Sequence, residues 1–207
     1  MSDVKSASIF AAHSRPILAR EFAEWGAAVI GPPALSPSLH AALLDEAKVQ
    51  IPVAGWNLTG TRARGQIQQD SRRAHLGPVA QWFLASTEVA ALLHTTTGRT
   101  LAPSWSATCY TQYIGPGQHM GEHCDKHDAC AIALLIYLRA IWTGREPSHG
   151  LRLFVFRGDN ADTGIASIVT THTNRAVILN GAQQAHLRPA LAPGESLTML
   201  AGCFRVA

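Results

Sequence analysis

The chain has 207 residues, of which 47% are hydrophobic and 15% charged, and its formal net charge is +3. This length accommodates one compact domain with a substantial core, and the composition is that of an ordinary folded protein rather than a disordered or fibrous one. The net charge is too small to indicate a nucleic-acid-binding surface by itself. We therefore expect a single domain over residues 1–207 whose partner is a small molecule or a peptide and not a nucleic acid.

The N-terminal segment is polar and lacks the basic stretch, apolar run and small-residue cleavage site of a secretory signal. No apolar run reaches the roughly 18 to 20 residues that a membrane helix needs. These features favour a cytoplasmic protein with no membrane partner. Cys109, Cys124, Cys130 and Cys203 have no zinc-finger spacing. In a reducing compartment disulfides are rare, so we expect four reduced thiols, mostly buried.

The first half of the chain combines helical periodicity with one short apolar strand. Ser36 and Pro37 offer an N-cap and an early proline to a helix that continues to about Val49. Residues 54–70 show no clean period and predict a loop or a short strand pair. The expected helices cover 19–25, 36–49, 80–83 and 88–97, and the expected strand lies within 26–33.

After Thr100 the pattern changes to short apolar, β-branched and aromatic runs separated by turn residues. These runs lie at 105–114, 121–126, 130–139, 150–157, 165–171, 175–180, 184–188 and 196–206. Such spacing is typical of a β-barrel or β-sandwich. Helices over about 1–99, followed by a strand-rich core over about 100–207, predict an α+β fold.

His123 and Asp125 form the most informative short motif of the chain. On a strand, side chains two residues apart share one face at a separation of about 6.6 Å, so the two can chelate one ion while Cys124 points away. A third ligand has to come from elsewhere, and His186 on a later strand is the natural supplier. Two histidines and one carboxylate are the facial triad that holds non-haem iron(II) and leaves coordination positions open.

Seven landmarks follow one another in the second half of the chain. They are Tyr110-Thr-Gln-Tyr113-Ile-Gly115, His123-Cys-Asp125, Leu134-Leu-Ile-Tyr137-Leu138, Gly150-Leu-Arg-Leu153-Phe154, Asn174-Arg-Ala-Val-Ile-Leu179, His186-Leu-Arg-Pro189 and Ser196-Leu-Thr198. In this order they resemble the 2-oxoglutarate/Fe(II) dioxygenases, specifically the prolyl 4-hydroxylase-like branch. The resemblance covers about residues 100–207 well and the first half only in outline. It implies a double-stranded β-helix, a jelly-roll or cupin-like barrel, with N-terminal supporting helices.

The resemblance also implies the cofactors and the reaction. Fe(II) would be held by His123, Asp125 and His186, 2-oxoglutarate would be the cosubstrate, and O2 the oxidant. The implied outcome is hydroxylation of an unactivated carbon with decarboxylation of 2-oxoglutarate to succinate. No catalytic residue beyond the metal ligands is expected.

Cosubstrate-binding residues follow the family pattern only in part. Tyr113 matches the family tyrosine that contacts the cosubstrate carboxylate. The basic residue that usually anchors the far carboxylate is missing, because positions 194–196 are Gly-Glu-Ser. A partly buried dicarboxylate needs a cationic partner. Arg188, which shares the strand face of His186, is slightly favoured over Arg205, and Asn180 is a further candidate near the metal.

The substrate is indicated only by the segment before the barrel. Trp56, Arg62, Arg64 and Gln66 are expected to contact it. These side chains favour a polar or acidic small molecule, such as an amino acid, free or within a peptide.

Two alternative functions use the same residues. A barrel that retains the metal ligands but lacks the usual anchor is compatible with a catalytically silent metal- and 2-oxoglutarate-binding sensor. His119, Glu122 and His123 also fit the His-x-x-Glu-His motif of a zinc metallopeptidase. That motif requires a helix, and the glycines in and before it argue against one.

Overall fold

The structure is a computed structural model of the chain, and it describes Phe10 and residues 15–54, 71–125 and 128–207. It also describes the backbone of short strands at 56–57, 62–63 and 66–67. Within this part of the chain, no helix combines the length and the apolar character needed to cross a membrane.

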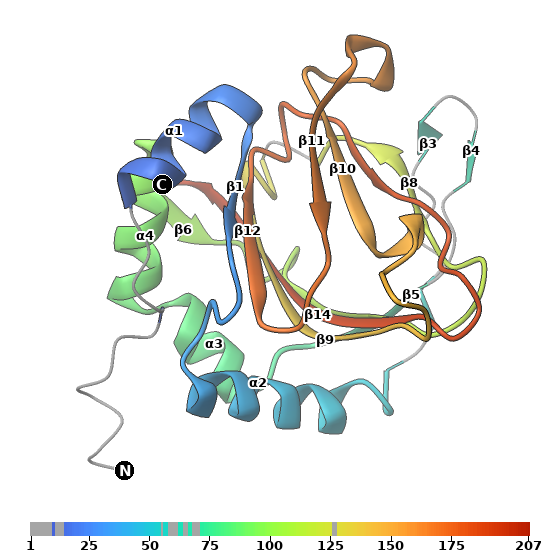
Figure 1. The fold of residues 1–207 in the computed structure, drawn as a ribbon. Coiled ribbons are helices and arrows are strands. Elements are labelled where there is room, and N and C mark those ends of the chain that lie inside the picture. The colour runs from blue at the N-terminus through green and yellow to red at the C-terminus, as the bar shows by residue number, and fades with distance from the viewer. Residues whose placement is uncertain are drawn as a thin grey trace.

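The described strands form two antiparallel sheets that pack against each other, and a short hairpin (Figure 1). The large sheet has the order β1 (Ala27–Ile30), β12 (Arg175–Leu179), β9 (Ile132–Ile141), β14 (Ser196–Val206), β7 (Cys109–Tyr113), β5 (Ser71–Ala74) and β2 (Trp56–Asn57), with β6 (Leu101–Pro103) also paired to β14. The small sheet has the order β11 (Ile165–Thr170), β10 (Arg152–Phe156), β13 (His186–Arg188) and β8 (Met120–His123). The hairpin joins β3 (Arg62–Ala63) to β4 (Gln66–Ile67).

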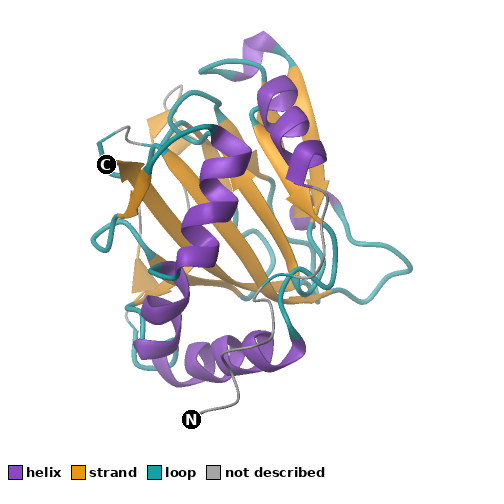
Figure 2. Ribbon diagram, turned by 90° about the vertical axis from the view of Figure 1, so that its left-hand side faces the viewer, coloured by secondary structure: helices purple, strands orange, loops and turns teal. Residues whose placement is uncertain are grey.

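Helices cover the outer face of the large sheet, as Figure 2 shows. They are α1 (Arg15–Trp25), α2 (Pro37–Gln50), α3 (Pro78–Leu84) and α4 (Thr87–Thr97), and two 3-10 turns lie at His149–Leu151 and Ala161–Thr163. The Ser36 hydroxyl accepts a hydrogen bond from the Leu39 amide, as the predicted N-cap requires. Gly98, with φ of 70°, ends α4 in the left-handed conformation that glycine adopts without strain.

Strand β9 shows why both faces of the large sheet are apolar. Leu134 and Ile136 pack among the helices, whereas Leu135 and Tyr137 face the small sheet. Alternating side chains therefore enter two different cores, and the strand is hydrophobic almost without interruption. The space between the two sheets holds the second core and, beside it, the candidate site.

The mixed α and β architecture was predicted, as were the helices of the first half and most strands of the second. Two strands of the first half, β1 and β5, belong to the large sheet. Strand β5 was missed: its sequence, Ser-Arg-Arg-Ala, has no apolar alternation. It forms because its backbone pairs with β7 on one side and β2 on the other.

The expectation of four reduced thiols is wrong for two of them. Cys130 and Cys203 form a disulfide, with their Cα atoms 4.8 Å apart. The reason lies in the sheet: β9 and β14 are neighbours, with Cys203 opposite Ala133, so the cysteine just before β9 reaches its partner. Cys109 and Cys124 are free and half-buried.

Candidate metal centre

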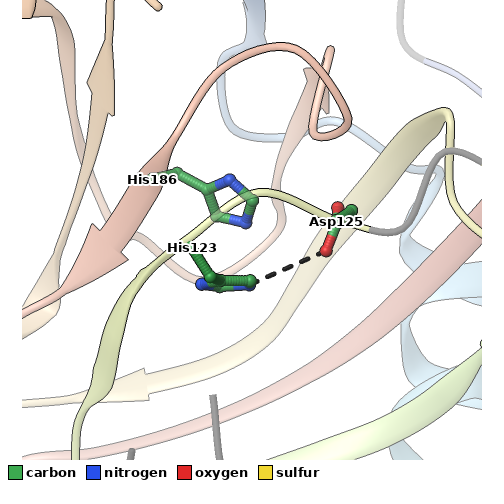
Figure 3. Close-up of side chains that lie close together, drawn as sticks. All are labelled: His123, Asp125 and His186. Atoms are coloured by element: carbon green, nitrogen blue, oxygen red, sulfur yellow. Dashed lines mark ion pairs between the residues drawn. The ribbon is translucent and has the colours of Figure 1, made fainter. Parts of the chain in front are cut away.

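Three potential ligands meet at one edge of the small sheet. His123 ends β8 and His186 begins β13, and the two residues are directly opposite each other in the antiparallel register. Their ring centroids are 4.2 Å apart. Asp125 follows β8, and its Oδ1 lies 3.7 Å from His123 Nε2. Figure 3 shows the three side chains gathered around one point, and a ligand atom of each lies within 4.8 Å of the others.

Backbone carbonyls orient both imidazoles. His123 Nδ1 lies 2.9 Å from the Gly121 carbonyl oxygen, and His186 Nδ1 lies 3.1 Å from that of Gln184. A carbonyl only accepts, so Nδ1 carries the hydrogen in each ring and the Nε2 lone pair remains for a metal. Burial, assisted by the neighbouring His186, lowers the pKa of His123 to about 3. His123 is therefore neutral at ordinary pH, the state in which it ligates a cation.

The loop after β12 holds the carboxylate in place. The Asp125 amide donates a hydrogen bond of 2.8 Å to the Gly181 carbonyl. The Asp125 carboxylate lies where a side chain at 181 would be, because a Cβ built on Gly181 overlaps it. Glycine at this position thus leaves the room that the third ligand occupies.

The donor set suits a divalent transition metal. Two imidazoles and one carboxylate supply three ligands and leave further positions open. Among the residues that the structure describes, this is the only group of His, Cys, Asp and Glu side chains close enough to share an ion.

The triad opens into a cavity of about 310 Å³ between the two sheets. Most of its wall is apolar, with Met120 and Leu153 from the small sheet and Leu135, Leu179 and Met199 from the large one. A cavity of this size far exceeds the roughly 10–15 Å³ that admits one water molecule. It has room for a ligand that reaches the triad.

Arg188 lies in the wall of this cavity and is only 2% exposed. Its guanidinium donates to Thr171 Oγ1 at 3.0 Å and to Tyr137 Oη at 3.2 Å. It also donates to the Gly150 carbonyl oxygen at 3.4 Å. All three partners are neutral, and no described carboxylate lies within ion-pair distance of Arg188. A buried cation without a counter-ion is costly, so the arrangement calls for an anionic ligand.

Tyr113 lies in the same wall, fully buried; the Ser71 side chain lies nearby, but the Tyr113 hydroxyl makes no hydrogen bond of normal length and geometry. Burial raises the pKa of Tyr113, more than the positive charges of Arg188 and Arg73 lower it. The phenol therefore stays protonated and retains a hydrogen to donate. An orphaned donor beside an unpaired arginine fits the oxygen atoms of a carboxylate.

No protein-family model matches the sequence, and no protein of curated function is significantly similar to it. Solved structures do match. The non-haem α-ketoglutarate-dependent epimerase SnoN from nogalamycin biosynthesis is 14% identical with a TM-score of 0.70, over 93% of this chain and 81% of that one. A Pseudomonas putida prolyl-4-hydroxylase is 18% identical with a TM-score of 0.65, over 93% and 98%. HygX from Streptomyces hygroscopicus, with nickel and 2-oxoglutarate bound, is 15% identical with a TM-score of 0.65, over 95% and 88%.

The chain has the fold of the 2-oxoglutarate/Fe(II) oxygenases. The resemblance found in the second half of the sequence therefore extends, at the level of structure, to nearly the whole chain. At these identities the likeness is one of fold, and the chemistry of this oxygenase fold has to be argued from its own residues.

The structure brings some of the predicted site residues together and separates others. His123, Asp125, His186, Tyr113 and Arg188 all line the one cavity. Arg205 lies on an exposed part of β14, opposite Ala102, and is not part of the cavity wall.

Asn180 is buried but does not line the cavity. It starts the turn that leads to His186: its carbonyl accepts from the amides of Gln183 and Gln184, and its side-chain amide donates to Gln183 Oε1 at 2.8 Å. The turn-forming role of an asparagine before glycine accounts for these contacts.

The predicted substrate residues lie largely outside the described part of the molecule. The backbones of Trp56, Arg62 and Gln66 belong to β2, β3 and β4, but their side chains are outside the described residues, and Arg64 is outside altogether.

The metallopeptidase alternative lacks the helix that it requires. His123 and Glu122 lie on strand β8, so neighbouring side chains point to opposite faces. Glu122 accepts a hydrogen bond from the Ala161 amide, and His119 Nδ1 lies 3.0 Å from the Gly117 carbonyl. His119 is not part of the ligand group.

Sequence reasoning missed four residues of the site: Arg73, Tyr137, Thr171 and Gly181. Tyr137 and Thr171 hold Arg188, Gly181 makes room for Asp125, and Arg73 lines the cavity. Because side chains alternate between the two faces of a strand, the predicted strand 130–139 could have placed Tyr137 on the same inward face as Leu135. Arg73 ends the segment in which substrate contacts were expected but was not singled out, and nothing in the sequence around Thr171 and Gly181 pointed to the cavity.

Proposed function

We propose that the chain is a non-haem Fe(II)- and 2-oxoglutarate-dependent oxygenase, and that its two facing sheets form a double-stranded β-helix. The observation that carries this proposal is a single cavity with a two-histidine, one-carboxylate group at one place and a buried, unpaired arginine at another. A dicarboxylate that chelates a metal through one end needs both features at once.

Each residue has a distinct role in this proposal. His123, Asp125 and His186 would hold the iron, with both Nε2 atoms presented by the backbone contacts to Nδ1. Bound iron(II) and 2-oxoglutarate together supply the activation of O2 and the oxidation of an unactivated carbon, with release of succinate and CO2. Arg188 would pair with the distal carboxylate in a charge-assisted hydrogen bond.

Tyr113 would donate its unshared hydrogen to a carboxylate oxygen of the cosubstrate, because the raised pKa keeps the phenol protonated. The apolar side chains around the cavity exclude water, which strengthens these polar contacts. The protein thus positions its ligands and keeps the site dry, and the redox chemistry belongs to the cofactors.

Hydroxylation of a small polar substrate, an amino acid or a peptide, is the outcome we propose. Asp125 occupies the carboxylate position of the triad, so all three protein ligands are present. The alternative of a non-catalytic sensor was based on the absence of the usual basic residue at 194–196. Arg188 supplies a cation in the cavity wall instead.

Succinate formation tests the proposal. Purified protein, Fe(II), 2-oxoglutarate and O2 are incubated with amino acids and short blocked peptides, and succinate is quantified by NMR. We expect succinate from the wild-type protein and none from His186→Ala or under anaerobic conditions. Tight binding of metal and 2-oxoglutarate without succinate from any mixture would instead identify a non-catalytic binding module.

A further inference from the structure

Strand geometry turns Arg73 into the cavity. In the register of the large sheet Arg73 is opposite Thr111 of β7, and Thr111 is opposite Met199 of β14. All three side chains line the cavity that contains the triad. The preceding residue, Arg72, lines a separate cavity on the outer face of the sheet, beside α2, as the alternation of a strand requires.

Among the residues that the structure describes, Arg73 has no anionic partner. The residue is half-buried, its Nε is buried without a hydrogen bond, and no described carboxylate lies within ion-pair distance. Among the described residues that line the cavity, Asp125 carries the only carboxylate, and it belongs to the triad. An arginine kept in this position without a counter-ion is costly unless a ligand supplies one.

The charge of Arg73 reaches the places where ligands are proposed to bind. Burial raises the pKa of Tyr113, and the positive charge of Arg73 adds a smaller lowering contribution. Its guanidinium therefore lies within electrostatic reach of Tyr113, and Arg73 lines the same cavity as the triad. This is where a substrate has to lie for one of its carbons to be oxidised.

The charges of the proposed cosubstrate leave Arg73 unmatched. One end of 2-oxoglutarate would go to the metal and the distal carboxylate to Arg188, which is the more deeply buried of the two cavity arginines. Among its described lining residues, the cavity thus offers two arginines for one distal carboxylate.

We propose that Arg73 binds a carboxylate of the substrate itself, so that this protein acts on an anionic small molecule. The inference rests on the proposed function, because it assigns the remaining cavity cation to the second ligand of that same site. A guanidinium binds a carboxylate through two parallel hydrogen bonds, which also orients the bound molecule. Neutral analogues of the same shape leave Arg73 unpaired and are rejected.

Binding of a simple carboxylate tests this assignment without turnover. Zn(II) and N-oxalylglycine, an unreactive analogue of 2-oxoglutarate, occupy the metal and cosubstrate sites, and butyrate or neutral butyramide is then titrated. Calorimetry gives the affinities, and the arginine Nε–H resonances report the contact. Since hydrogen bonds to charged groups contribute about 1.5–3 kcal/mol, we expect butyrate to bind roughly ten- to a hundredfold more tightly than butyramide.

Three variants localise the effect. Arg73→Met should weaken butyrate binding about tenfold or more while the affinity for N-oxalylglycine stays within about twofold. The butyrate affinity of Arg73→Lys should lie between those of the wild type and Arg73→Met, because lysine keeps the charge but cannot form two parallel hydrogen bonds to one carboxylate. Arg72→Met is the matched control: it removes the adjacent arginine from the outer face and should change neither affinity.

Several results would overturn the proposal. These are equal affinity for butyrate and butyramide, unchanged butyrate binding in Arg73→Met, or a loss of N-oxalylglycine affinity in that variant, which would make Arg73 a cosubstrate residue. If the wild-type protein binds neither Zn(II) nor N-oxalylglycine, it is the proposed function that fails. The anion site is then tested in metal-free Arg188→Met protein, with folding checked by circular dichroism. If this protein binds butyrate and the additional substitution Arg73→Met abolishes the binding, the site is supported. If the Arg188→Met protein does not bind butyrate, the site is refuted.

Discussion

The two sheets of this protein contribute differently to its stability and to the candidate site. The large sheet has long strands such as β9 and β14, both of its faces are covered, and its side chains contribute to both hydrophobic clusters. The small sheet has short strands, yet β8 and β13 carry both histidines of the triad and Arg188. Stability and chemistry therefore come mainly from different sheets, and mutations in the two should have separable effects.

The largest expected effect is the loss of metal on removing a small-sheet ligand. His186→Ala should weaken Zn(II) or Fe(II) binding by more than about a hundredfold, because one of three ligands is gone and changes even to outer-shell partners of metal ligands cost about 10- to 100-fold. Metal content after loading and dialysis measures this. His119→Ala is the matched control, since His119 lies outside the ligand group. Unchanged metal content in His186→Ala would contradict the site.

A large-sheet mutation should show the opposite pattern. Ile136 is fully buried between the sheet and the helices. Ile136→Ala should lower the free energy of unfolding by about 2–5 kcal/mol, as deletions of buried aliphatic groups do. Metal affinity, measured at a temperature where the variant is folded, should remain at the wild-type value. Loss of metal from folded Ile136→Ala would show that the two sheets are not separable in this way.

Arg188→Met tests the cosubstrate end of the small sheet. Removing the buried cation should weaken N-oxalylglycine binding about ten- to a hundredfold, through the loss of charge-assisted hydrogen bonds, while metal affinity is kept. Arg205→Met serves as the comparison, because Arg205 is exposed on β14. Calorimetric titration gives the N-oxalylglycine affinity of both variants. A larger loss of affinity in Arg205→Met than in Arg188→Met would place the cosubstrate-binding arginine on the large sheet.

The smallest effect concerns the loop that joins the two sheets. Gly181→Ala places a methyl group where the Asp125 carboxylate lies, so the third ligand has to move. We expect metal affinity to fall about tenfold, at the lower end of what changes next to metal ligands cost. Gly31→Ala, where an added Cβ meets nothing within 4 Å, is the control and should bind metal normally. Equal affinities in the two variants would mean that Asp125 does not depend on this space.

Residues that repeat at strand spacing were predictable, and residues that depend on strand pairing were not. His186 and Arg188 are two apart on β13, so their shared surroundings follow from alternation, whereas Asp125 lies two residues after His123, just beyond the end of β8. Arg73 gave no such signal, because β5 pairs through its backbone and its inward face meets a cavity rather than a packed core. The Cys130–Cys203 disulfide spans 73 residues and depends on β9 lying beside β14. No local pattern contains that information.

The position of β5 between β7 and β2 has a consequence for specificity. Arg72 and Arg73 are adjacent in sequence but open onto different cavities on opposite faces of the sheet. A slip of one residue in the alignment of β5 would exchange them, since every side chain of a slipped strand changes face. The main-chain pairing of β5 with β7 and β2 therefore decides which of two adjacent arginines enters the cavity and which lies on the opposite face, beside α2.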